Sequence, residues 1–347
     1  MVECWVQILL WSIISVLATI IIIYIIISSM MSNIRQSFIN QFNEYFDELC
    51  ESPDTIYRKD VYIPYKNGTY EKDLATALLD ISFNVTKANC DNLLPIPNPP
   101  EFNQQLRIQG ISPIDGQSTM YAYIFWNMSL GFACIAFTGT VSLSEWKSDV
   151  QYEQVAPTQL NGYQDGILVH QGFYNIYLSI RNQLWSWWNQ NSTCITTLFI
   201  TGHSLGGALS TICSFDFADA LSPIISMNKD IKCVVPKDEI YFPIHYSFAA
   251  PRSGNTGYVQ VFNERIPTSI RVNNTEDIVP QLPPAAWING PILKKLGLFW
   301  DGWIYEQTGG NIPFTVSLGS IANNHIQAYH DYLPECAQVA PCHIDNN

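Results

Sequence analysis

The sequence predicts an α/β protein in which a mostly parallel sheet is flanked by helices, and two observations support this prediction. From about residue 105 onward, short β-branched apolar runs alternate with stretches whose apolar residues recur at helical spacing. Such alternation is typical of strand–helix–strand units in a parallel or mixed sheet. The predicted strands are 130–137, 195–201, 240–249 and 268–272, and the predicted helices are 174–188 and 205–221.

The composition of the 347-residue chain allows a large apolar core and excludes one class of partner. Apolar residues make up 47%, which is enough for the core of one large domain. The formal net charge is −13 with only 17 Lys and Arg, and no Lys/Arg-rich block occurs. A basic stripe for a phosphate backbone is therefore missing, so we expect no nucleic-acid partner. The acidic balance also gives no attraction to anionic lipid.

An uncharged stretch near the N-terminus predicts a membrane anchor. Residues 5–28 carry no charged side chain over 24 positions, and a helix needs about 20 residues to cross the hydrocarbon core. A cleaved signal peptide is the alternative, but its apolar stretch spans only about 7–15 residues after a basic start. Glu3 is the only early charge, so we expect a single-pass signal-anchor over 1–30 and a stalk or linker over 31–74. The few flanking cations, with Arg35 nearest, leave the orientation open.

Two further features indicate the compartment of the chain beyond the anchor. The chain has five N-x-S/T sequons, which alone are a weak signal in a sequence rich in these residues. It also has nine cysteines, of which Cys134 and Cys213 lie in apolar runs and are predicted to be buried thiols. Six others lie near segment ends and predict disulfides in a lumenal or extracellular compartment. The sequons are at Asn67, Asn84, Asn127, Asn191 and Asn273, and the six cysteines are Cys50, Cys90, Cys194, Cys233, Cys336 and Cys342.

A G-x-S-x-G motif lies where a predicted strand meets a predicted helix. It reads Gly202-His203-Ser204-Leu205-Gly206 and is followed by another glycine. Because the turn from strand to helix is tight, glycines flank a serine whose oxygen is exposed. The helix directs its first N–H groups, that of Leu205 among them, at a developing oxyanion. Chance matches to this motif are common, but the flanking strand and helix favour a nucleophilic Ser204.

Candidate partners for this serine follow it in the chain. A serine nucleophile needs a base, and the base needs an orienting acid. In strand–helix hydrolases the order is serine, then Asp or Glu, then histidine. Asp277 follows the predicted strand 268–272 and is the candidate acid, with a turn-capping role as the structural alternative. The later histidines are His325, His330 and His343.

Several motifs occur in an order that points to one family. The segment 201–209 reads T-G-H-S-L-G-G-A-L, and 277–284 reads D-I-V-P-Q-L-P-P. Three others agree with F-R-G-S/T at 137–140, with H-x-G-F at 170–173 and with G-A-P-R-x-G-N at 249–255. Together they resemble the class 3 lipases, the fungal-type triacylglycerol lipases and their phospholipase relatives. The resemblance covers residues 75–336 of a predicted domain 75–347 and implies the α/β-hydrolase fold.

The resemblance implies a role for each candidate residue. Ser204 matches the family's nucleophile, and Asp277 matches its triad acid. Thr140 matches the oxyanion residue, which contributes its backbone N–H and hydroxyl beside the N–H of Leu205. Thr138 departs from the family's arginine, which we expect to weaken a local ion pair without changing the chemistry. The resemblance implies no cofactor, and no metal-ligand spacing occurs in the sequence.

The base stays open between two histidines. The family has an Asp-His-x-x-Tyr motif followed by a cysteine. His325 keeps the family's distance to Cys336 and follows residues 323–324, two asparagines that predict a helix cap. His330 would lie inside that helix and is the rival, and neither histidine has a tyrosine at the family's spacing. The resemblance also pairs Cys336 with Cys90, at the end of the first helix of the domain.

The implied function is hydrolysis of lipid esters. Family members cover the site with a lid, and residues 142–149, with Trp146, lie where a lid would open at a lipid surface. The aromatic segment 287–303 is either core or a lipid contact. We therefore expect a membrane-anchored acyl hydrolase of triacylglycerol, diacylglycerol or phospholipid that acts through an acyl-enzyme at a lipid interface. The alternatives are an esterase of feruloyl-type esters and a catalytically inactive lipid-binding protein.

Overall fold

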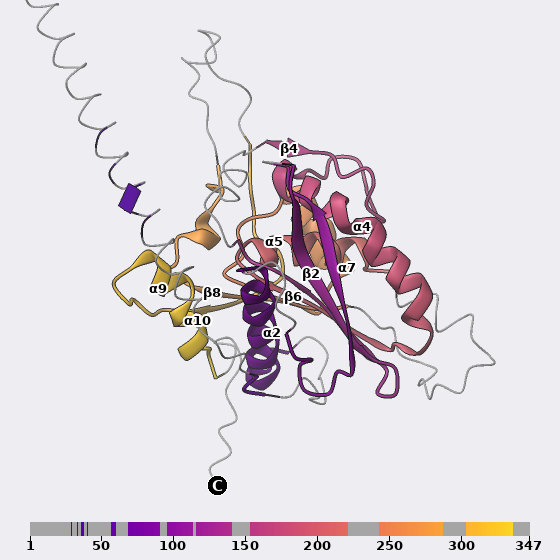
Figure 1. The fold of residues 1–347 in the computed structure, drawn as a ribbon. Helices are drawn as coiled ribbons and strands as arrows, with labels where there is room; N and C mark the ends of the chain where they lie inside the picture. The colour runs from indigo at the N-terminus through magenta and orange to yellow at the C-terminus, as the bar shows by residue number, and fades with distance from the viewer. Residues whose placement is uncertain are drawn as a thin grey trace, which may run out of the picture.

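A seven-stranded sheet forms the centre of the molecule. The computed structural model describes residues 29, 33, 36–37, 40, 57–59, 69–90, 96–113, 116–140, 153–220, 243–286 and 303–335. Within them the strand order is β1-β2-β3-β6-β7-β8-β9 (Figure 1). The strands β1, β2 and β3 pair antiparallel, and β3, β6, β7, β8 and β9 pair parallel. The predicted α/β architecture with a mostly parallel sheet is confirmed.

The strands and helices have the following bounds. The central strands are β1 Gln104–Ile111, β2 Ser118–Asn127, β3 Phe132–Phe137, β6 Thr197–His203, β7 Ile244–Phe248, β8 Ser269–Asn274 and β9 Gly310–Phe314. A separate two-stranded ladder pairs β4 Gln154–Val155 with β5 Val169–His170. The helices are α2 Lys72–Cys90, α4 Gln171–Asn191, α5 Leu205–Asp216, α7 Thr256–Arg265, α9 Ile321–His325 and α10 Gln327–Asp331. Two short 3-10 turns are η1 Ser192–Cys194 and η2 Val279–Gln281.

The predicted elements are present, with ends that differ by a few residues. The strand predicted over 130–137 begins at Phe132, because the preceding Gly131 has a φ of 75° and belongs to a turn. The helix predicted over 205–221 begins at the expected residue and ends at Asp216. The predicted strands 195–201, 240–249 and 268–272 correspond to β6, β7 and β8, and the predicted helix 174–188 lies within α4.

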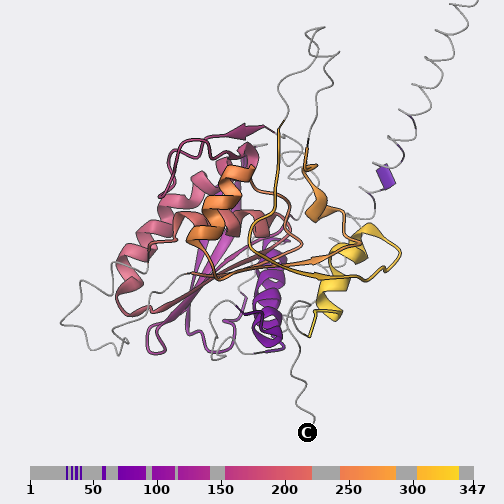
Figure 2. The same ribbon diagram turned by 180° about the vertical axis from the view of Figure 1, so that it is seen from behind.

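Alternate residues of β3 face two different apolar layers. Ile135 and Phe137 join the core that includes α4, α5 and α7, whereas Cys134 and Ala136 join the core under α2. One strand contributes to both layers because successive side chains of a strand point to opposite faces of the sheet. Figures 1 and 2 show α9 and α10 beside α2, and Tyr329 of α10 belongs to the α2 core. The C-terminal helices are therefore packed on the same face as α2.

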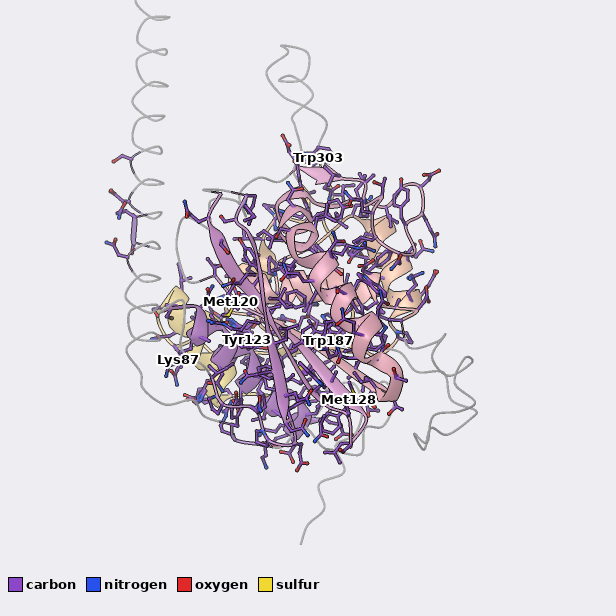
Figure 3. The ribbon with its side chains drawn as sticks, turned by 45° about the vertical axis from the view of Figure 1, so that its right-hand side comes forward. Lys87, Met120, Tyr123, Met128, Trp187 and Trp303 are labelled. Carbon is purple, nitrogen blue, oxygen red and sulfur yellow. The ribbon has the colours of Figure 1, made fainter. Side chains whose placement is uncertain are left out.

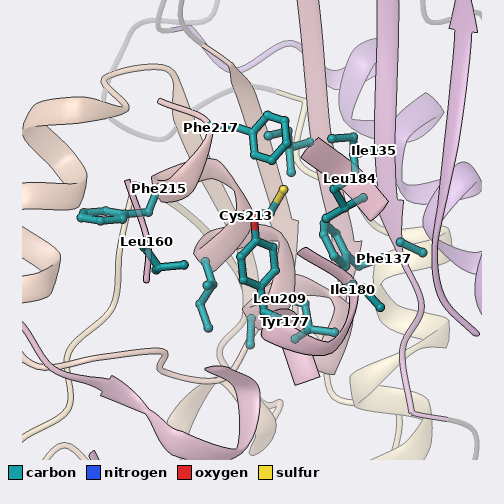
Figure 4. Packing of buried hydrophobic residues seen from close by; sticks show 14 of the residues in the cluster. Ile135, Phe137, Leu160, Tyr177, Ile180, Leu184, Leu209, Cys213, Phe215 and Phe217 are labelled. Carbon is teal, nitrogen blue, oxygen red and sulfur yellow. The ribbon is translucent and has the colours of Figure 1, made fainter. Parts of the chain in front are cut away.

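The larger core lies between the sheet and the helices α4 and α5. Leu209 and Cys213 of α5 pack in one cluster with Leu184 of α4, and all three are buried (Figure 4). Trp187, near the end of α4, belongs to the same cluster, and Met128 packs against it (Figure 3). This core buries α5, the helix that follows the predicted nucleophile.

Part of the predicted linker 31–74 packs onto the folded body. Arg58 donates from its backbone N–H and its Nε to the buried carboxylate of Asp80 in α2, at 2.7 and 2.8 Å. Its Nη1 donates to the carbonyl oxygen of His330 in α10, at 2.5 Å. Tyr70 is also buried, and its hydroxyl donates to the carbonyl oxygen of Pro334 at 2.8 Å. These linker residues therefore contribute contacts to the folded body.

The described segments contain both free and disulfide-bonded cysteines. Cys134 and Cys213 are buried free thiols, as the sequence predicts. Cys90, the last residue of α2, is disulfide-bonded. Its predicted partner, Cys336, lies outside the described residues, so this pairing stays a prediction. The residue before Cys336, Glu335, forms an ion pair with Lys72 in the first turn of α2.

Three of the five predicted glycosylation sequons have a buried asparagine. Asn84 in α2, Asn127 in β2 and Asn273 in β8 are all buried. The Asn127 side chain is also fully engaged, because it donates to the carbonyl oxygen of Glu101 and accepts from the N–H groups of Ser129 and Leu130. A glycan needs a surface site. The sequons therefore carry less support for an oxidising compartment than their number suggests.

No helix among the residues that the structure describes is long and apolar enough to cross a bilayer. The uncharged stretch over 5–28 lies outside those residues. The anchor therefore stays a prediction.

The contact between Arg58 and Asp80 leads to a stability prediction. The Arg58→Ala variant should lose about 3 kcal/mol of unfolding free energy, because the Asp80 carboxylate would stay buried without its charged partner. Urea denaturation at neutral pH measures the difference.

The neighbouring residue provides a matched control. Lys59 pairs with Asp73 at 3.1 Å, with both side chains at least half exposed. The Lys59→Ala variant should change the unfolding free energy by less than about 1 kcal/mol, since exposed ion pairs contribute little. Equal losses in the two variants would contradict the assignment of Arg58 to the folded body.

Candidate active site

Ser204 lies at the turn between β6 and α5 in a strained backbone conformation. Its φ is 58° and its ψ is −126°, and a positive φ is rare for a residue with a side chain. Such strain costs on the order of 1–3 kcal/mol and persists only where surrounding contacts impose it. Here the Ser204 N–H donates to the carbonyl oxygen of Phe248 at 2.9 Å, and the Ser204 carbonyl accepts from Gly207 N at 2.9 Å. Hydrogen bonds on both sides hold the serine in this turn.

The glycines of the motif are required by the space around the turn. A Cβ atom added at Gly202 would lie 2.1 Å from the carbonyl oxygen of Gly206. A Cβ atom added at Gly206 would lie 2.5 Å from the carbonyl oxygen of Phe137, at the end of β3. Both distances are far shorter than van der Waals contact. The structure thus confirms the steric argument made from the sequence.

Asp277 and His325 are in direct contact. His325 Nδ1 lies 2.8 Å from Asp277 Oδ2, and both side chains are almost completely buried. A carboxylate only accepts, so Nδ1 carries the proton, and Nε2 is the basic nitrogen of the neutral imidazole. Asp277 Oδ1 accepts from the N–H of Val279 at 2.9 Å. Asp277 therefore fixes both the tautomer and the orientation of His325.

The two candidate bases, His325 and His330, have different contacts. His330 lies in α10 with a side chain that is 41% exposed, and its Nδ1 faces the neighbouring Asp331 at 2.6 Å. Of these two histidines, only His325 contacts Asp277. The helix cap predicted at residues 323–324 is wrong, because these residues lie inside α9. The cap is Ser320, whose hydroxyl accepts from Asn323 N at 3.0 Å.

Tyr329 also binds Asp277, a contact that was not foreseen from the sequence. Its hydroxyl donates to Asp277 Oδ2 at 2.9 Å and accepts from the N–H of Asn274 at 2.9 Å. Burial, with a smaller effect from the Asp277 charge, raises the pKa of Tyr329 well above its usual value, so the phenol stays protonated. The two short helices α9 and α10 meet at Ile326, with φ −130° and ψ −65°. His325 and Tyr329 lie on either side of this break and bind the same carboxylate oxygen.

His203, the residue before the nucleophile, contacts His325. Its Nε2 lies 2.8 Å from the His325 carbonyl oxygen, and the two ring centroids are 4.7 Å apart. Burial, followed by the neighbouring His325, lowers the pKa of His203 well below its usual value. The ring is therefore neutral, and its Nε2–H is the donor because a carbonyl oxygen can only accept. His203 thus connects the serine turn to the segment that carries His325.

The predicted oxyanion residues lie on adjacent segments. Phe137 at the end of β3 is the register partner of Gly202 in β6, so the segments after these parallel strands leave the same edge of the sheet. Thr140 is 2% exposed, and its hydroxyl has no hydrogen-bond partner among the described residues. Leu205 is the first residue of α5, where an N–H group has no partner within the helix. The oxyanion roles of Thr140 and Leu205 stay predictions.

Four further expectations from the sequence concern the surroundings of the site. Thr138, which replaces the family's arginine, donates its hydroxyl to the carbonyl oxygen of Met120 at 3.2 Å, a neutral hydrogen bond in place of an ion pair. The predicted lid 142–149 and nearly all of the aromatic segment 287–303 lie outside the described residues, and only the half-buried Trp303 is described. No group of three or more His, Cys, Asp or Glu side chains suited to a metal occurs in the described segments.

The strained serine turn and the Asp277–His325 pair on this sheet define the α/β-hydrolase class. Residues 134–287 match the family described as Lipase (class 3), in agreement with the resemblance found in the sequence. The chain is 29% identical over 156 residues to a lipase of Rhizomucor miehei, which covers 44% of this chain and 38% of that protein. It is 30% identical over 176 residues to phospholipase A1-II 4 of Oryza sativa subsp. japonica, with 44% and 40% covered.

A solved structure of the Rhizomucor miehei lipase propeptide complex has a TM-score of 0.37 with this chain, at 25% identity and with 52% of each chain covered. In sequence, the chain spans about two fifths of the length of the curated relatives named above.

The two hydrogen bonds of Tyr329 lead to a second stability prediction. The Tyr329→Phe variant should lose about 1–3 kcal/mol of unfolding free energy, because the buried Asn274 N–H would lose its acceptor. Tyr332, which is 49% exposed, gives a matched control, and Tyr332→Phe should change stability by less than about 0.5 kcal/mol. Thermal unfolding followed by circular dichroism measures both, and equal shifts would disprove the assigned role.

Proposed function

We propose that the chain is a serine carboxylic-ester hydrolase that acts on lipid esters with Ser204, His325 and Asp277 as its triad. The observation that carries the proposal is the 2.8 Å contact between His325 Nδ1 and Asp277 Oδ2, in a segment bound by His203, the residue before the strained Ser204. The pair fixes the tautomer in which His325 Nε2 can accept a proton. The order of the three residues along the chain agrees with this class of hydrolase.

The proposed reaction proceeds through an acyl-enzyme. Ser204 Oγ attacks the ester carbonyl carbon while His325 Nε2 takes the hydroxyl proton, and Asp277 stabilises the resulting imidazolium. The negative oxygen of the tetrahedral intermediate accepts hydrogen bonds from the N–H of Leu205 and from Thr140. Collapse of the intermediate releases the alcohol with the proton from His325. Water then attacks the acyl-enzyme by the same steps in reverse and frees the fatty acid.

The proposed substrate class is the lipid esters, namely triacylglycerol, diacylglycerol or phospholipid. Support comes from the relatives, which are named a lipase and a phospholipase A1. An assay series separates this class from its alternatives. Emulsified triolein and phosphatidylcholine vesicles should be hydrolysed faster than soluble ethyl ferulate. Faster turnover of ethyl ferulate indicates an esterase of non-lipid esters, and no turnover of any ester indicates a lipid-binding protein.

We also propose that a single-pass anchor holds the body at a membrane on the lumenal or extracellular side. The support is the stretch 5–28, whose 24 positions without charge exceed the length that a bilayer requires. Full-length protein should stay with membranes during an alkaline carbonate wash, because an inserted helix is not removed by pH or salt. Release into the soluble fraction, or a mature N-terminus near residue 30, would contradict the anchor.

Loss of the nucleophile should abolish the activity. The Ser204→Ala variant should fold normally and lose turnover by a factor on the order of 10⁶, as is typical when a triad member is removed. Ser186, exposed on α4, gives the matched control, and Ser186→Ala should keep full activity and full labelling by a fluorophosphonate probe. Appreciable activity in a folded Ser204→Ala protein would falsify the serine mechanism.

The two histidines provide a test of the base. The His325→Ala variant should lose both ester hydrolysis and fluorophosphonate labelling, because Ser204 would have no proton acceptor. The His330→Ala variant should keep most of both, since its side chain is 41% exposed and faces Asp331. Rates measured with p-nitrophenyl butyrate compare the two directly, and an inactive His330→Ala beside an active His325→Ala would reverse the assignment.

A further inference from the structure

Helix α2 carries two buried hydroxyl groups directed at two segments of the proposed site. Ser82 Oγ lies 3.3 Å from Thr201 Oγ1 in β6, three residues before Ser204. Thr86, one turn further along α2, accepts a hydrogen bond at its Oγ1 from the N–H of Gly139, at 2.8 Å. One face of α2 therefore contacts the strand of the nucleophile and the segment of the oxyanion residue.

The direction of the Thr86 hydrogen bonds is determined by their partners. The Thr86 hydroxyl donates its only proton to the carbonyl oxygen of Ser82 at 2.8 Å. The hydroxyl oxygen is therefore oriented to accept, and the Gly139 N–H is the donor. Thr86 is 4% exposed, so water does not readily replace this acceptor. The Gly139 N–H is thus bound to a single, well-oriented side chain.

The segment around Gly139 is confined on its other side by the serine turn. A Cβ atom added at Gly139 would lie 3.3 Å from the carbonyl oxygen of His203 and 3.4 Å from Thr86 Oγ1. Gly206, after the nucleophile, approaches the carbonyl oxygens of Phe137 and Thr138 so closely that no Cβ atom fits there. The chain that leads into Thr140 therefore lies between α2 and the serine turn, and Thr86 is its hydrogen-bonding contact on the α2 side.

We propose that Thr86 is a positioning residue for the oxyanion donors of Thr140. The inference rests on the proposed function, because an oxyanion forms only if Ser204 attacks an ester. By fixing the peptide N–H of Gly139, Thr86 sets the orientation of the next residue, whose N–H and buried hydroxyl would face the developing charge. A donor displaced by about 1 Å loses much of its effect on the transition state. Thr86 itself does not touch the substrate.

Three substitutions on α2 test the proposal in the full-length protein. Thr86→Val removes the hydroxyl at nearly constant volume, and Thr86→Ser keeps the hydroxyl and removes the methyl group. Thr76→Val is the matched control, because Thr76 Oγ1 also donates to the carbonyl oxygen four residues earlier, that of Lys72, at 2.9 Å. Thr76 lies ten residues before Thr86, about 15 Å away along the helix axis. The substrate is p-nitrophenyl butyrate below its solubility limit.

The expected result is a loss in kcat without a matching change in KM. Thr86→Val should lower kcat about 10- to 100-fold and slow inactivation by the organophosphate paraoxon to a similar extent, since both reactions need the oxyanion donors. KM should stay within about twofold, because ground-state binding is not changed. Thr86→Ser and Thr76→Val should behave as the unsubstituted protein. If Thr86→Val does not fold, Thr86→Ala removes the same hydroxyl and is compared in the same way.

Two results would overturn the inference while leaving the proposed function intact. In the first, Thr86→Val keeps full kcat while Ser204→Ala is inactive. In the second, Thr86→Val and Thr76→Val lose kcat equally, which indicates only a general loss of stability. If Ser204→Ala itself stays active, the proposed function fails, and the role of Thr86 fails with it. The three outcomes are therefore distinguishable within one set of variants.

Discussion

The carboxylate of Asp277 accepts hydrogen bonds from three groups, one from its own turn and two from the C-terminal helices α9 and α10. His325 Nδ1 and the Tyr329 hydroxyl share one oxygen, and the Val279 N–H binds the other. A buried carboxylate is costly unless such donors surround it, so its placement depends on all three. The same contacts fix the tautomer and the orientation of His325.

The surroundings of Asp277 are held together by one buried side chain. Asn274 accepts at Oδ1 from the Val316 N–H at 2.9 Å and donates from Nδ2 to the Asn324 carbonyl oxygen at 3.1 Å. Its backbone N–H binds Tyr329, and its carbonyl oxygen accepts from the Asp277 N–H at 3.1 Å. The segments that follow β8, β9 and α9 therefore meet at one residue.

Helix α5, which follows Ser204, is fixed at both of its ends. At its start, Ser204 is held in a strained conformation by backbone hydrogen bonds. At its end, the fully buried Asp216 accepts from Arg181 Nε at 2.8 Å, from the Tyr177 hydroxyl at 2.8 Å and from Trp185 Nε1 at 2.7 Å. All three donors lie on α4. A buried polar network with every member satisfied gives rigidity, and here it holds α5 against α4 while the strain stays at the serine.

The sequence by itself determined the features that depend on short-range physics. The alternation of strands and helices follows from apolar periodicity, and the serine turn follows from the steric demands at Gly202 and Gly206. The order Ser204, then Asp277, then a histidine could also be derived along the chain. The choice between the two histidines, however, required the tertiary structure, because it depends on which side chain reaches the carboxylate across the molecule.

The tertiary structure also decided which polar residues support the site. Tyr329 reaches Asp277 from 52 positions further along the chain, and no local pattern in the sequence marks that contact. Thr86 and Gly139 are 53 positions apart and meet only because α2 packs over β3 and β6. Burial likewise removed the apparent significance of the sequon at Asn127. Periodicity and turn sterics act over a few residues, whereas these contacts depend on strand register and helix packing between distant segments.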